Sequence, residues 1–194
     1  MPRITLIGYR GTGKSTVAGL LADMLGCGWC DADAVLEGRV GCSIATLVRE
    51  RGEGVFRDAE AAVLADLLAA YPGVLSTGGG AVLRAGNREA LREAGRPIVW
   101  LTAAADVVRA RLAADPGTAE RRPALSASTT GDPLAEVAAT LSAREPLYRE
   151  CADHSVDTSA LPPAEVAAEI MAWLRTGWAG RHGPAAGGRE GASS

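Results

Sequence analysis

The sequence predicts an α/β fold in which a central parallel sheet of about five strands lies between two layers of helices. Apolar segments of strand composition alternate along the chain with segments whose apolar residues recur at helical spacing. A glycine-rich loop stands between the first predicted strand and the first predicted helix. The chain of 194 residues is long enough for one domain with a sizeable core.

The predicted strands and helices follow one another in a regular order. Short apolar runs predict strands at residues 3–8, 74–77, 97–102 and 154–157, and a further strand is expected to end near Asp31. Helical periodicity predicts helices at residues 16–25, about 43–51, 53–70, 87–94, 104–114, 132–149 and 162–176. Gly26 ends the first helix, and Asp132-Pro133 and Pro162-Pro163 begin the last two. Ligands of such sheets gather at the carboxyl ends of the strands, so the functional site is expected there.

Two segments interrupt this pattern. Residues 114–131 contain turn formers, small residues and the pair Arg121-Arg122, with little to bury. This composition is typical of the mobile lid of a phosphotransferase, and an ordinary long surface loop is the alternative. Residues 177–194 are rich in Gly, Ala and Ser and have no periodicity, which predicts a disordered, non-catalytic tail. Residues 1–176 are therefore the predicted single domain.

The composition limits the possible partners. A formal net charge of −3 leaves no basic excess for a nucleic-acid partner. No apolar run has the length of a membrane span and no signal peptide precedes Tyr9-Arg10, so we expect a cytoplasmic protein with no membrane partner. We also expect a monomer. Cys27 and Cys30 have C-x-x-C spacing, which leaves a redox or zinc role open. Small, partly buried residues in a reducing compartment are the simpler interpretation.

The only lysine of the chain, Lys14, lies in the segment Gly8–Ser15, which has the form G-x-x-x-x-G-K-S. This motif is the Walker A motif or P-loop, a cradle for phosphates. Its glycines let backbone N–H groups turn inward, its lysine places a compact charge on the β- and γ-phosphates, and Ser15 offers a hydroxyl to Mg²⁺. A strand before it and a helix after it are the required context. The sequence therefore predicts an ATP site formed by Arg10, Gly11, Thr12, Gly13, Lys14, Ser15 and Thr16.

A kinase also needs an acceptor site, and two pairs of residues are candidates for it. Asp31 and Asp33 follow the predicted second strand. On an extended segment these carboxylates would point to opposite faces, one toward the metal and the other toward the acceptor, and a surface Asx turn is the alternative. Arg57 can bind a substrate carboxylate bidentately, with Glu60 one helical turn later to hold it. An exposed helix ion pair is the alternative for Arg57 and Glu60.

Two later segments extend the candidate site. Gly78-Gly79-Gly80 ends a predicted strand, and three glycines favour the close approach of a ligand to the backbone over a plain tight turn. Arg144 lies late in a predicted helix, in the sequence Arg-Glu-Pro-Leu-Tyr. Taken alone, Arg144 is most simply a solvated or salt-bridged surface residue.

Together these motifs resemble the shikimate kinases, small members of the P-loop kinase group, from about Ile4 to Leu174. The resemblance rests on five motifs in the family's order: G-x-x-G-x-G-K-S at 8–15, D-x-D at 31–33, F-R-x-x-E at 56–60, G-G-G-A at 78–81 and R-x-P-L-Y at 144–148. Arg122-Pro123 resembles the Arg-Pro of the family's lid. The resemblance implies a P-loop kinase fold with a mobile lid. It also implies transfer of the γ-phosphoryl of ATP to the 3-hydroxyl of shikimate, in aromatic amino acid biosynthesis.

The resemblance further implies a role for each matching residue. Asp33 would bind the shikimate hydroxyls and orient or deprotonate the attacking one, while Lys14 and Arg122 would stabilise the transferring phosphoryl. The remaining implied ligands are Arg57 and Arg144 for the carboxylate, the backbone N–H groups of Gly79 and Gly80 for the substrate, and Ser15 for Mg²⁺, with Asp31 acting on the metal through water. An arginine that a closing lid supplies would also exclude water from the site.

The sequence departs from the family pattern at two places. Ala124 follows Arg122-Pro123 where the family usually has leucine, so Arg121 is an alternative to Arg122. Residues 158–162 lack the arginine that many members place near the adenine, and Arg111 is a further nucleotide-side candidate. No acidic residue ends the predicted strand 74–77, a feature that the family shares, which leaves Asp31 as the metal-side carboxylate.

Two other functions are compatible with parts of the pattern. Another small-metabolite kinase of the same group, such as a gluconate kinase, would share the phosphate loop but would not be expected to combine Asp33, Arg57 and Arg144. A nucleotide-binding regulatory module would need no acceptor site, and the same three residues speak against it.

Overall fold

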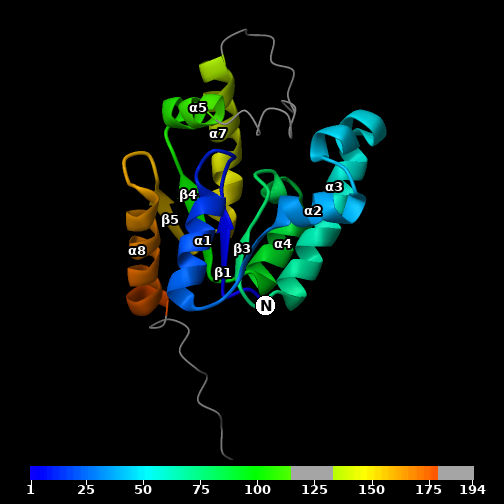
Figure 1. Ribbon diagram of the computed structural model, residues 1–194. Coiled ribbons are helices and arrows are strands. Elements are labelled where there is room, and N and C mark those ends of the chain that lie inside the picture. The colour runs from blue at the N-terminus through cyan, green and yellow to red at the C-terminus, as the bar shows by residue number, and fades with distance from the viewer. Residues whose placement is uncertain (115–132, 179–194) are drawn as a thin grey trace, which may run out of the picture.

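The computed structural model describes residues 1–114 and 133–178. Five strands form one sheet in the order β2-β3-β1-β4-β5, and each neighbouring pair is parallel. The strands are β1 (Ile4–Ile7), β2 (Trp29–Asp31), β3 (Val74–Ser76), β4 (Ile98–Thr102) and β5 (His154–Asp157). All five carboxyl ends therefore lie at the same edge of the sheet, and the predicted parallel sheet is confirmed (Figure 1).

Helices cover both faces of the sheet and form the two outer layers (Figure 1). One face packs against α1 (Lys14–Leu25) and α8 (Pro163–Trp173), and the other packs against α3 (Ile44–Ala70), α4 (Ala85–Ala94) and α7 (Pro133–Cys151). Beside them, α2 (Ala32–Val40) packs on α3 and α5 (Ala105–Ala114) packs on α7. A 3₁₀ turn, η1 (Ala81–Leu83), follows β3, and a π-helical turn, η2 (Leu174–Trp178), ends the described chain. None of the described helices is both long enough and apolar enough to cross a membrane.

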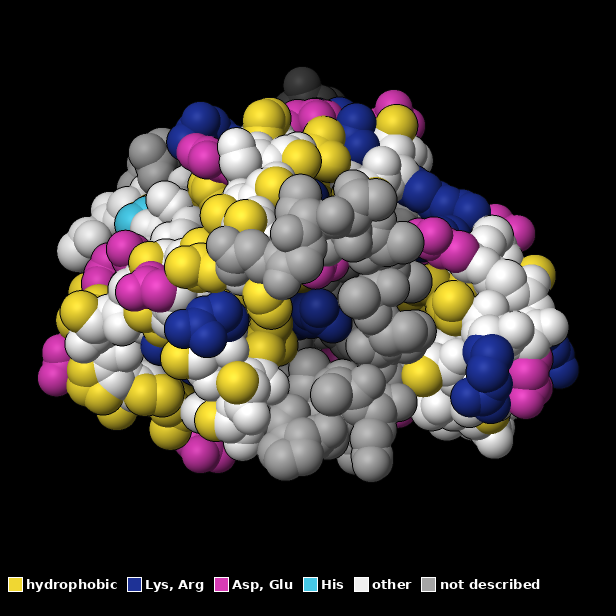
Figure 2. Space-filling model, turned by 90° about the horizontal axis from the view of Figure 1, so that it is seen from above, with side chains coloured by type: hydrophobic (Ala, Val, Ile, Leu, Met, Phe, Trp, Pro, Cys, Tyr) yellow, Lys and Arg dark blue, Asp and Glu magenta, His cyan; other side chains and the backbone are white. Residues whose placement is uncertain are grey.

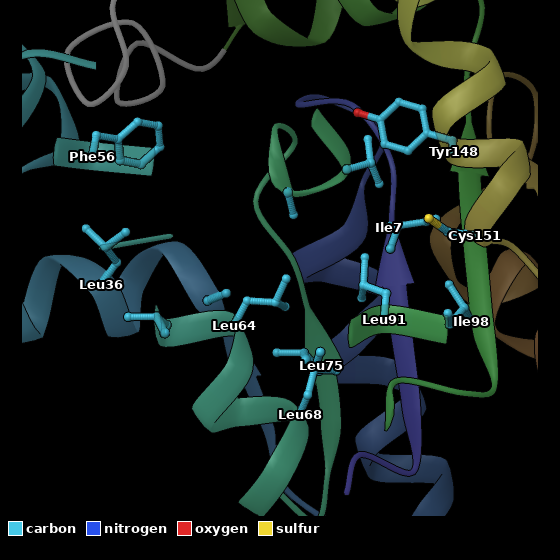
Figure 3. Packing of buried hydrophobic residues seen from close by; sticks show 14 of the residues in the cluster. Ile7, Leu36, Phe56, Leu64, Leu68, Leu75, Leu91, Ile98, Tyr148 and Cys151 are labelled. Atoms are coloured by element: carbon cyan, nitrogen blue, oxygen red, sulfur yellow. The ribbon is translucent and has the colours of Figure 1, made fainter. Parts of the chain in front are cut away.

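Side chains that alternate along the strands divide the core into two halves. Leu6 and Val99 face α1 and α8, while Ile7, Leu75 and Ile98 face the opposite layer. Figure 3 shows this second half, in which the strand residues are covered by Leu64, Leu68 and Leu91. The inner strands β1, β3 and β4 are buried on both faces and consist mostly of apolar residues, and this is why the sequence revealed them. The outer strands β2 and β5 are partly exposed and more polar, so their signals in the sequence are weaker.

One helix, α2, is absent from the sequence-based prediction, which treats Asp31–Asp33 as an extended segment. Asp31 instead ends β2 and caps α2, where its Oδ1 accepts a hydrogen bond from the backbone N–H of Asp33 at 3.0 Å. Leu36 is the only large apolar residue that α2 buries, so the sequence of this helix has little helical periodicity.

The other helix boundaries follow the predicted signals closely. Gly52, with φ 86° and ψ 163°, breaks α3 between the two predicted helices at 43–51 and 53–70. Gly26 caps α1 in the left-handed conformation, and Pro163 begins α8. Gly177 and Trp178, the first residues of the predicted tail, still belong to η2. The rest of that tail and the predicted lid beyond Ala114 lie outside the described residues.

The end of the described chain is fixed near the amino ends of β4 and β5. The rings of His154 and Trp173 stack with centroids 4.7 Å apart, and the ring of Trp178 lies 5.9 Å from that of Trp173. The guanidinium of Arg96 lies 5.6 Å from the Trp178 ring and forms an ion pair with Asp153. These five side chains lie at the edge of the sheet opposite the carboxyl ends of the strands.

The cysteines agree with the simpler interpretation of their spacing. Cys27 and Cys30 are free thiols and are half-buried. Burial raises the pKa of the Cys30 thiol to about 11, so that this cysteine is protonated and unreactive at neutral pH. Among the described residues, no group of three or more His, Cys, Asp or Glu side chains is arranged to hold a metal ion, so the C-x-x-C pair has no zinc site there.

Candidate active site

A cavity of about 570 Å³ lies at the carboxyl ends of the strands, where the parallel sheet predicts it. It is lined by the loop after β1, the start of α1, the junction of β2 and α2, the end of β3 and part of α5. The predicted site residues among its walls are Arg10, Gly11, Gly13, Lys14, Ser15, Thr16, Asp31, Asp33 and Arg111. Figure 2 looks onto this end of the molecule, where Lys and Arg side chains lie in a hollow of the surface.

The loop Gly8–Ser15 has the conformation that explains its glycines. Gly8, Gly11 and Gly13 have φ values of 144°, 79° and 88°, which L side chains rarely adopt. The Lys14 side chain is buried and turns back over the loop, where Nζ donates hydrogen bonds to the carbonyl oxygens of Gly8 at 2.8 Å and Tyr9 at 3.0 Å. The hydroxyl of Thr12 donates to the same Tyr9 carbonyl at 2.8 Å. The loop is therefore held in shape by its own residues, with the ammonium at the cavity wall.

Ser15 and Asp31, the predicted metal-side pair, lie next to each other in the wall of the cavity. The Ser15 hydroxyl donates to Asp31 Oδ2 at 2.7 Å, and the Ser76 hydroxyl donates to the same oxygen at 3.3 Å. A hydroxyl and a carboxylate oxygen side by side are donors of the kind that Mg²⁺ prefers. Mg²⁺ in phosphoryl-transfer sites usually takes one or two protein oxygens, and phosphates and water supply the rest. The residues present therefore fit the predicted ion.

Asp33 reaches the site by a route different from the predicted one. The carboxylates of Asp31 and Asp33 diverge because the chain turns from strand to helix between them, and not because they alternate along an extended segment. Asp33 lies in the first turn of α2 and is buried. A Cβ on Gly78 would lie 2.6 Å from Asp33 Oδ1 and 3.0 Å from Glu60 Oε1, so this glycine makes room for both carboxylates.

Arg57 is a buried cation and not part of an exposed helix ion pair. The side chains of Arg57 and Glu60 are 9% and 7% exposed, and Arg57 Nη1 donates to Glu60 Oε2 at 2.8 Å. The predicted support of Arg57 by Glu60 is thus confirmed, and the surface alternative is excluded. Burial raises the pKa of Glu60, and the nearby guanidinium opposes that shift. On one side of the guanidinium lies the Phe56 ring, 4.7 Å away, and a Cβ on Gly80 would clash with Nη1.

Arg144 and Tyr148 tie α7 to the glycine turn, which we define as Gly78–Gly80. The carbonyl oxygen of Gly79 accepts a hydrogen bond from the Tyr148 hydroxyl at 2.6 Å and another from Arg144 Nη1 at 3.3 Å. The Arg144 guanidinium also lies 5.3 Å from the ring of Tyr9 in the phosphate loop. Tyr148 is buried and stacks on Trp100 at 5.7 Å, and burial raises the pKa of its hydroxyl, which remains a donor. Arg144 is therefore not a solvated surface residue.

Arg111 connects the phosphate loop to the segment after β5. Its Nη1 donates to Thr158 Oγ1 at 2.9 Å and to the Gly11 carbonyl at 3.3 Å, and its Nη2 donates to the Thr158 carbonyl at 2.6 Å. The Thr158 hydroxyl in turn donates to the Thr12 carbonyl at 3.1 Å. These bonds place Arg111 next to the phosphate loop, and its role toward the nucleotide stays a prediction. Arg121 and Arg122 lie outside the described residues.

Four residues that support the site have no role in the sequence-based prediction. Glu53 contacts Arg57, and its i, i+4 spacing on a helix is a signal that could have revealed it. Tyr148 is part of the motif at 144–148 but has no partner visible in the sequence. Ser76 and Thr158 reach the site only because the ends of β3 and β5 lie next to the phosphate loop and Asp31.

The fold and the site together define a class of protein. A P-loop follows β1 and begins α1, with a hydroxyl–carboxylate pair beside it. A buried carboxylate and two arginines surround a glycine turn. These are the parts of a P-loop phosphotransferase with a small acidic acceptor.

The chain belongs to the shikimate kinase family, since the model of that family, described as shikimate kinase, matches residues 10–175. It is similar to the shikimate kinase of Oleidesulfovibrio alaskensis, with 47% identity over 90% of this chain and 98% of that protein. It is also similar to the shikimate kinase of Rhodopirellula baltica, with 43% identity over 86% of this chain and 87% of that protein. The chain is thus an ATP-dependent kinase, as the sequence motifs predict.

Solved structures agree with this assignment. The shikimate kinase of Acinetobacter baumannii in complex with shikimate superimposes with a TM-score of 0.80 at 33% identity, covering 89% of this chain and 92% of that one. The shikimate kinase of Aquifex aeolicus gives a TM-score of 0.70 at 30% identity, covering 90% of this chain and 96% of that one. A gluconokinase of Sinorhizobium meliloti matches with a TM-score of 0.53 at 22% identity, covering 89% of this chain and 90% of that one, and shares the fold alone.

Proposed function

We propose that this kinase transfers the γ-phosphoryl of ATP to the 3-hydroxyl of shikimate, and that the glycine turn Gly78–Gly80 is the centre of the acceptor site. One observation carries the proposal. Each glycine of the turn adjoins one side chain of the proposed acceptor site, since Gly78 lies against Asp33, Gly79 accepts from Arg144, and Gly80 lies against Arg57. Three side chains from three helices thus meet around three consecutive residues.

The charges around this turn suit a polyhydroxy acid. Arg57 and Arg144 are two guanidiniums that approach one turn from α3 and α7, and a guanidinium matches the planar fork of a carboxylate. Asp33 is an acceptor for a hydroxyl proton, so it orients or deprotonates the attacking oxygen. The backbone N–H groups of Gly79 and Gly80 complete the substrate contacts.

The nucleotide side is proposed to consist of the phosphate loop and its neighbours. Lys14 compensates phosphate charge, the loop residues Arg10–Thr16 surround the phosphates, and Arg111 contributes from α5. Ser15 and Asp31 would hold Mg²⁺, which neutralises charge on the phosphates when it is bound. Arg122 is proposed to act from the lid, with Arg121 as the alternative. Positioning and electrostatics, rather than covalent chemistry, then account for the reaction.

We also propose that the enzyme acts as a monomer in the cytoplasm.

The proposal is tested by measuring ADP release in the presence of ATP and Mg²⁺ with shikimate, with gluconate, or without an acceptor. We expect rapid turnover with shikimate only, and mass spectrometry of the product should show one added phosphoryl group. Turnover with gluconate alone would assign the chain to the other kinase, and slow hydrolysis unaffected by either acid would indicate a regulatory nucleotide-binding module.

A further inference from the structure

The buried guanidinium of Arg57 has two carboxylate neighbours that differ in how freely they can move. Glu60 accepts from Nη1 at 2.8 Å, and its side chain is 7% exposed. Glu53 accepts from Nε at 3.3 Å and from Nη2 at 3.2 Å through the single oxygen Oε1, and its side chain is 50% exposed. Glu60 is enclosed, whereas Glu53 can turn its charge into water at little desolvation cost.

Glu53 lies on the edge of Arg57 that suits an incoming carboxylate. The Nε/Nη2 edge of a guanidinium presents two parallel N–H groups, which is the geometry of bidentate carboxylate binding. Nη1 is already bonded to Glu60, Phe56 covers one side, and Gly80 adjoins Nη1. The Nε/Nη2 edge is therefore the part of the guanidinium at which a carboxylate can be exchanged.

The position of Glu53 in α3 also favours exchange. It directly follows Gly52, the residue with φ 86° that interrupts the helix, and Arg51 through Val55 are all exposed. The side chain thus starts from a break in the helix and faces solvent on one side. Arg57, one helical turn later, is held by Glu60 whether or not Glu53 stays in contact.

We propose that Glu53 is an internal stand-in for the acceptor carboxylate: it holds the Nε/Nη2 edge of Arg57 until the acid binds, and the acid then displaces it. This inference rests on the proposed role of Arg57 as a carboxylate ligand. Exchange of one carboxylate for another keeps the buried cation paired throughout. It also makes Glu53 a specificity-determining residue, because an acceptor without a negative charge gains nothing by displacing it.

The alternative is that Glu53 only orients Arg57, and the two roles predict opposite effects. If Glu53 competes with the acid, removing its charge by Glu53→Gln strengthens acid binding. We expect the Kd and KM for shikimate to fall about two- to fivefold, the range expected for removal of one partly exposed competing ion pair, with a smaller change in kcat. If Glu53 only orients Arg57, the same variant raises both constants.

The experiment compares shikimate with its uncharged methyl ester in the wild-type enzyme, in Glu53→Gln and in the matched variant Glu50→Gln. Glu50 lies on the same helix and pairs at 3.5 Å with the exposed Arg49, which is not a residue of the proposed site. Calorimetry gives Kd, the ADP-release assay gives KM and kcat, and thermal unfolding reports that each variant is folded. We expect Glu53→Gln to improve binding of the acid and leave binding of the ester unchanged, and Glu50→Gln to change neither.

Each other outcome has one meaning. A Kd for shikimate that is unchanged or higher in folded Glu53→Gln overturns the stand-in role of Glu53, while the proposed function stands. An equal gain for the acid and the ester also overturns it, because the effect would not involve the acceptor carboxylate. Equal binding of acid and ester by the wild-type enzyme would instead contradict the proposed carboxylate site itself.

Discussion

Two glycine-rich segments follow neighbouring strands of the sheet, and their glycines are needed for different physical reasons. β1 leads into the phosphate loop and β3, its hydrogen-bonded neighbour, leads into the glycine turn. Three glycines of the phosphate loop have positive φ. Gly13 has open space where a Cβ would lie, so only its backbone conformation requires glycine, whereas a Cβ on Gly8 would also lie 2.4 Å from the Leu101 carbonyl oxygen. The glycine turn is not among the described positive-φ positions, and Gly80 has φ −101°, but a Cβ there would clash with Arg57.

The phosphate loop depends mainly on its own backbone conformation, whereas the proposed acceptor site depends on side chains that come together from separate helices. The phosphate loop is complete within one continuous segment, whose lysine and threonine bond to its own carbonyl oxygens. The glycine turn acquires its chemistry from α2, α3 and α7. The side chains of Asp33 and Arg57 need the space that Gly78 and Gly80 leave, and Arg144 bonds to the Gly79 carbonyl. A short sequence motif is therefore enough to predict the phosphate loop, whereas the proposed acceptor site depends on the whole fold.

Asp33→Asn should have the largest effect, and it should impair the acceptor side while sparing the phosphate loop. The amide keeps the shape of Asp33 but cannot accept a proton, so we expect kcat to fall by about 10²–10⁴-fold, while the affinity for ATP changes little. Single-turnover kinetics and nucleotide titration measure the two effects. A variant that retains full activity would remove Asp33 from the chemical step.

Arg57→Lys should damage only the acceptor side. One ammonium cannot reproduce the bidentate geometry or the bond to Glu60, so we expect the KM for shikimate to rise about ten- to a hundredfold, with the KM for ATP unchanged. Steady-state kinetics with each substrate varied in turn provides the measurement. An unchanged KM for shikimate would make Arg57 a structural residue.

A pair of glycine substitutions tests the comparison itself. Gly80→Ala is compatible with the backbone but pushes against Arg57, so we expect about a tenfold rise in the KM for shikimate and little effect on ATP. Gly13→Ala meets no neighbour but strains the backbone at φ 88°, which costs about 1–2 kcal/mol and should weaken ATP binding instead. If both variants raise the KM of the same substrate, the two glycine-rich segments do not serve separate substrates.

Tyr148→Phe should give the smallest effect. It removes the hydroxyl that donates to the Gly79 carbonyl at 2.6 Å and keeps the ring stacked on Trp100. We expect the free energy of unfolding to fall by about 1 kcal/mol and the KM for shikimate to rise two- to threefold, since Arg144 still bonds to the same carbonyl. Urea denaturation and kinetics check both, and a fully stable variant would show that this hydrogen bond is dispensable.

The sequence predicted most where the relevant interactions are local. The apolar strands and the phosphate loop could be predicted from adjacent residues, and the break at Gly52 lies between the two helices that periodicity predicts at 43–51 and 53–70. α2 was missed because its single large buried residue leaves almost no pattern. Burial of Arg57 was invisible, because helical spacing identifies a neighbour such as Glu60 but not whether the pair faces water. The bond from Tyr148 to Gly79 joins residues that are 69 positions apart, a contact that only the fold creates.

The stack of Arg96, Trp178, Trp173 and His154 has a practical consequence. It holds Trp178, the last described residue, near the amino ends of β4 and β5, whereas the cavity lies at the carboxyl ends of the strands. A surface anchor or fusion partner attached directly at Trp178 would lie at the end of the molecule opposite the cavity, so that substrate approaches from the far side. The molecule is therefore suited to oriented immobilisation through an attachment made directly at Trp178.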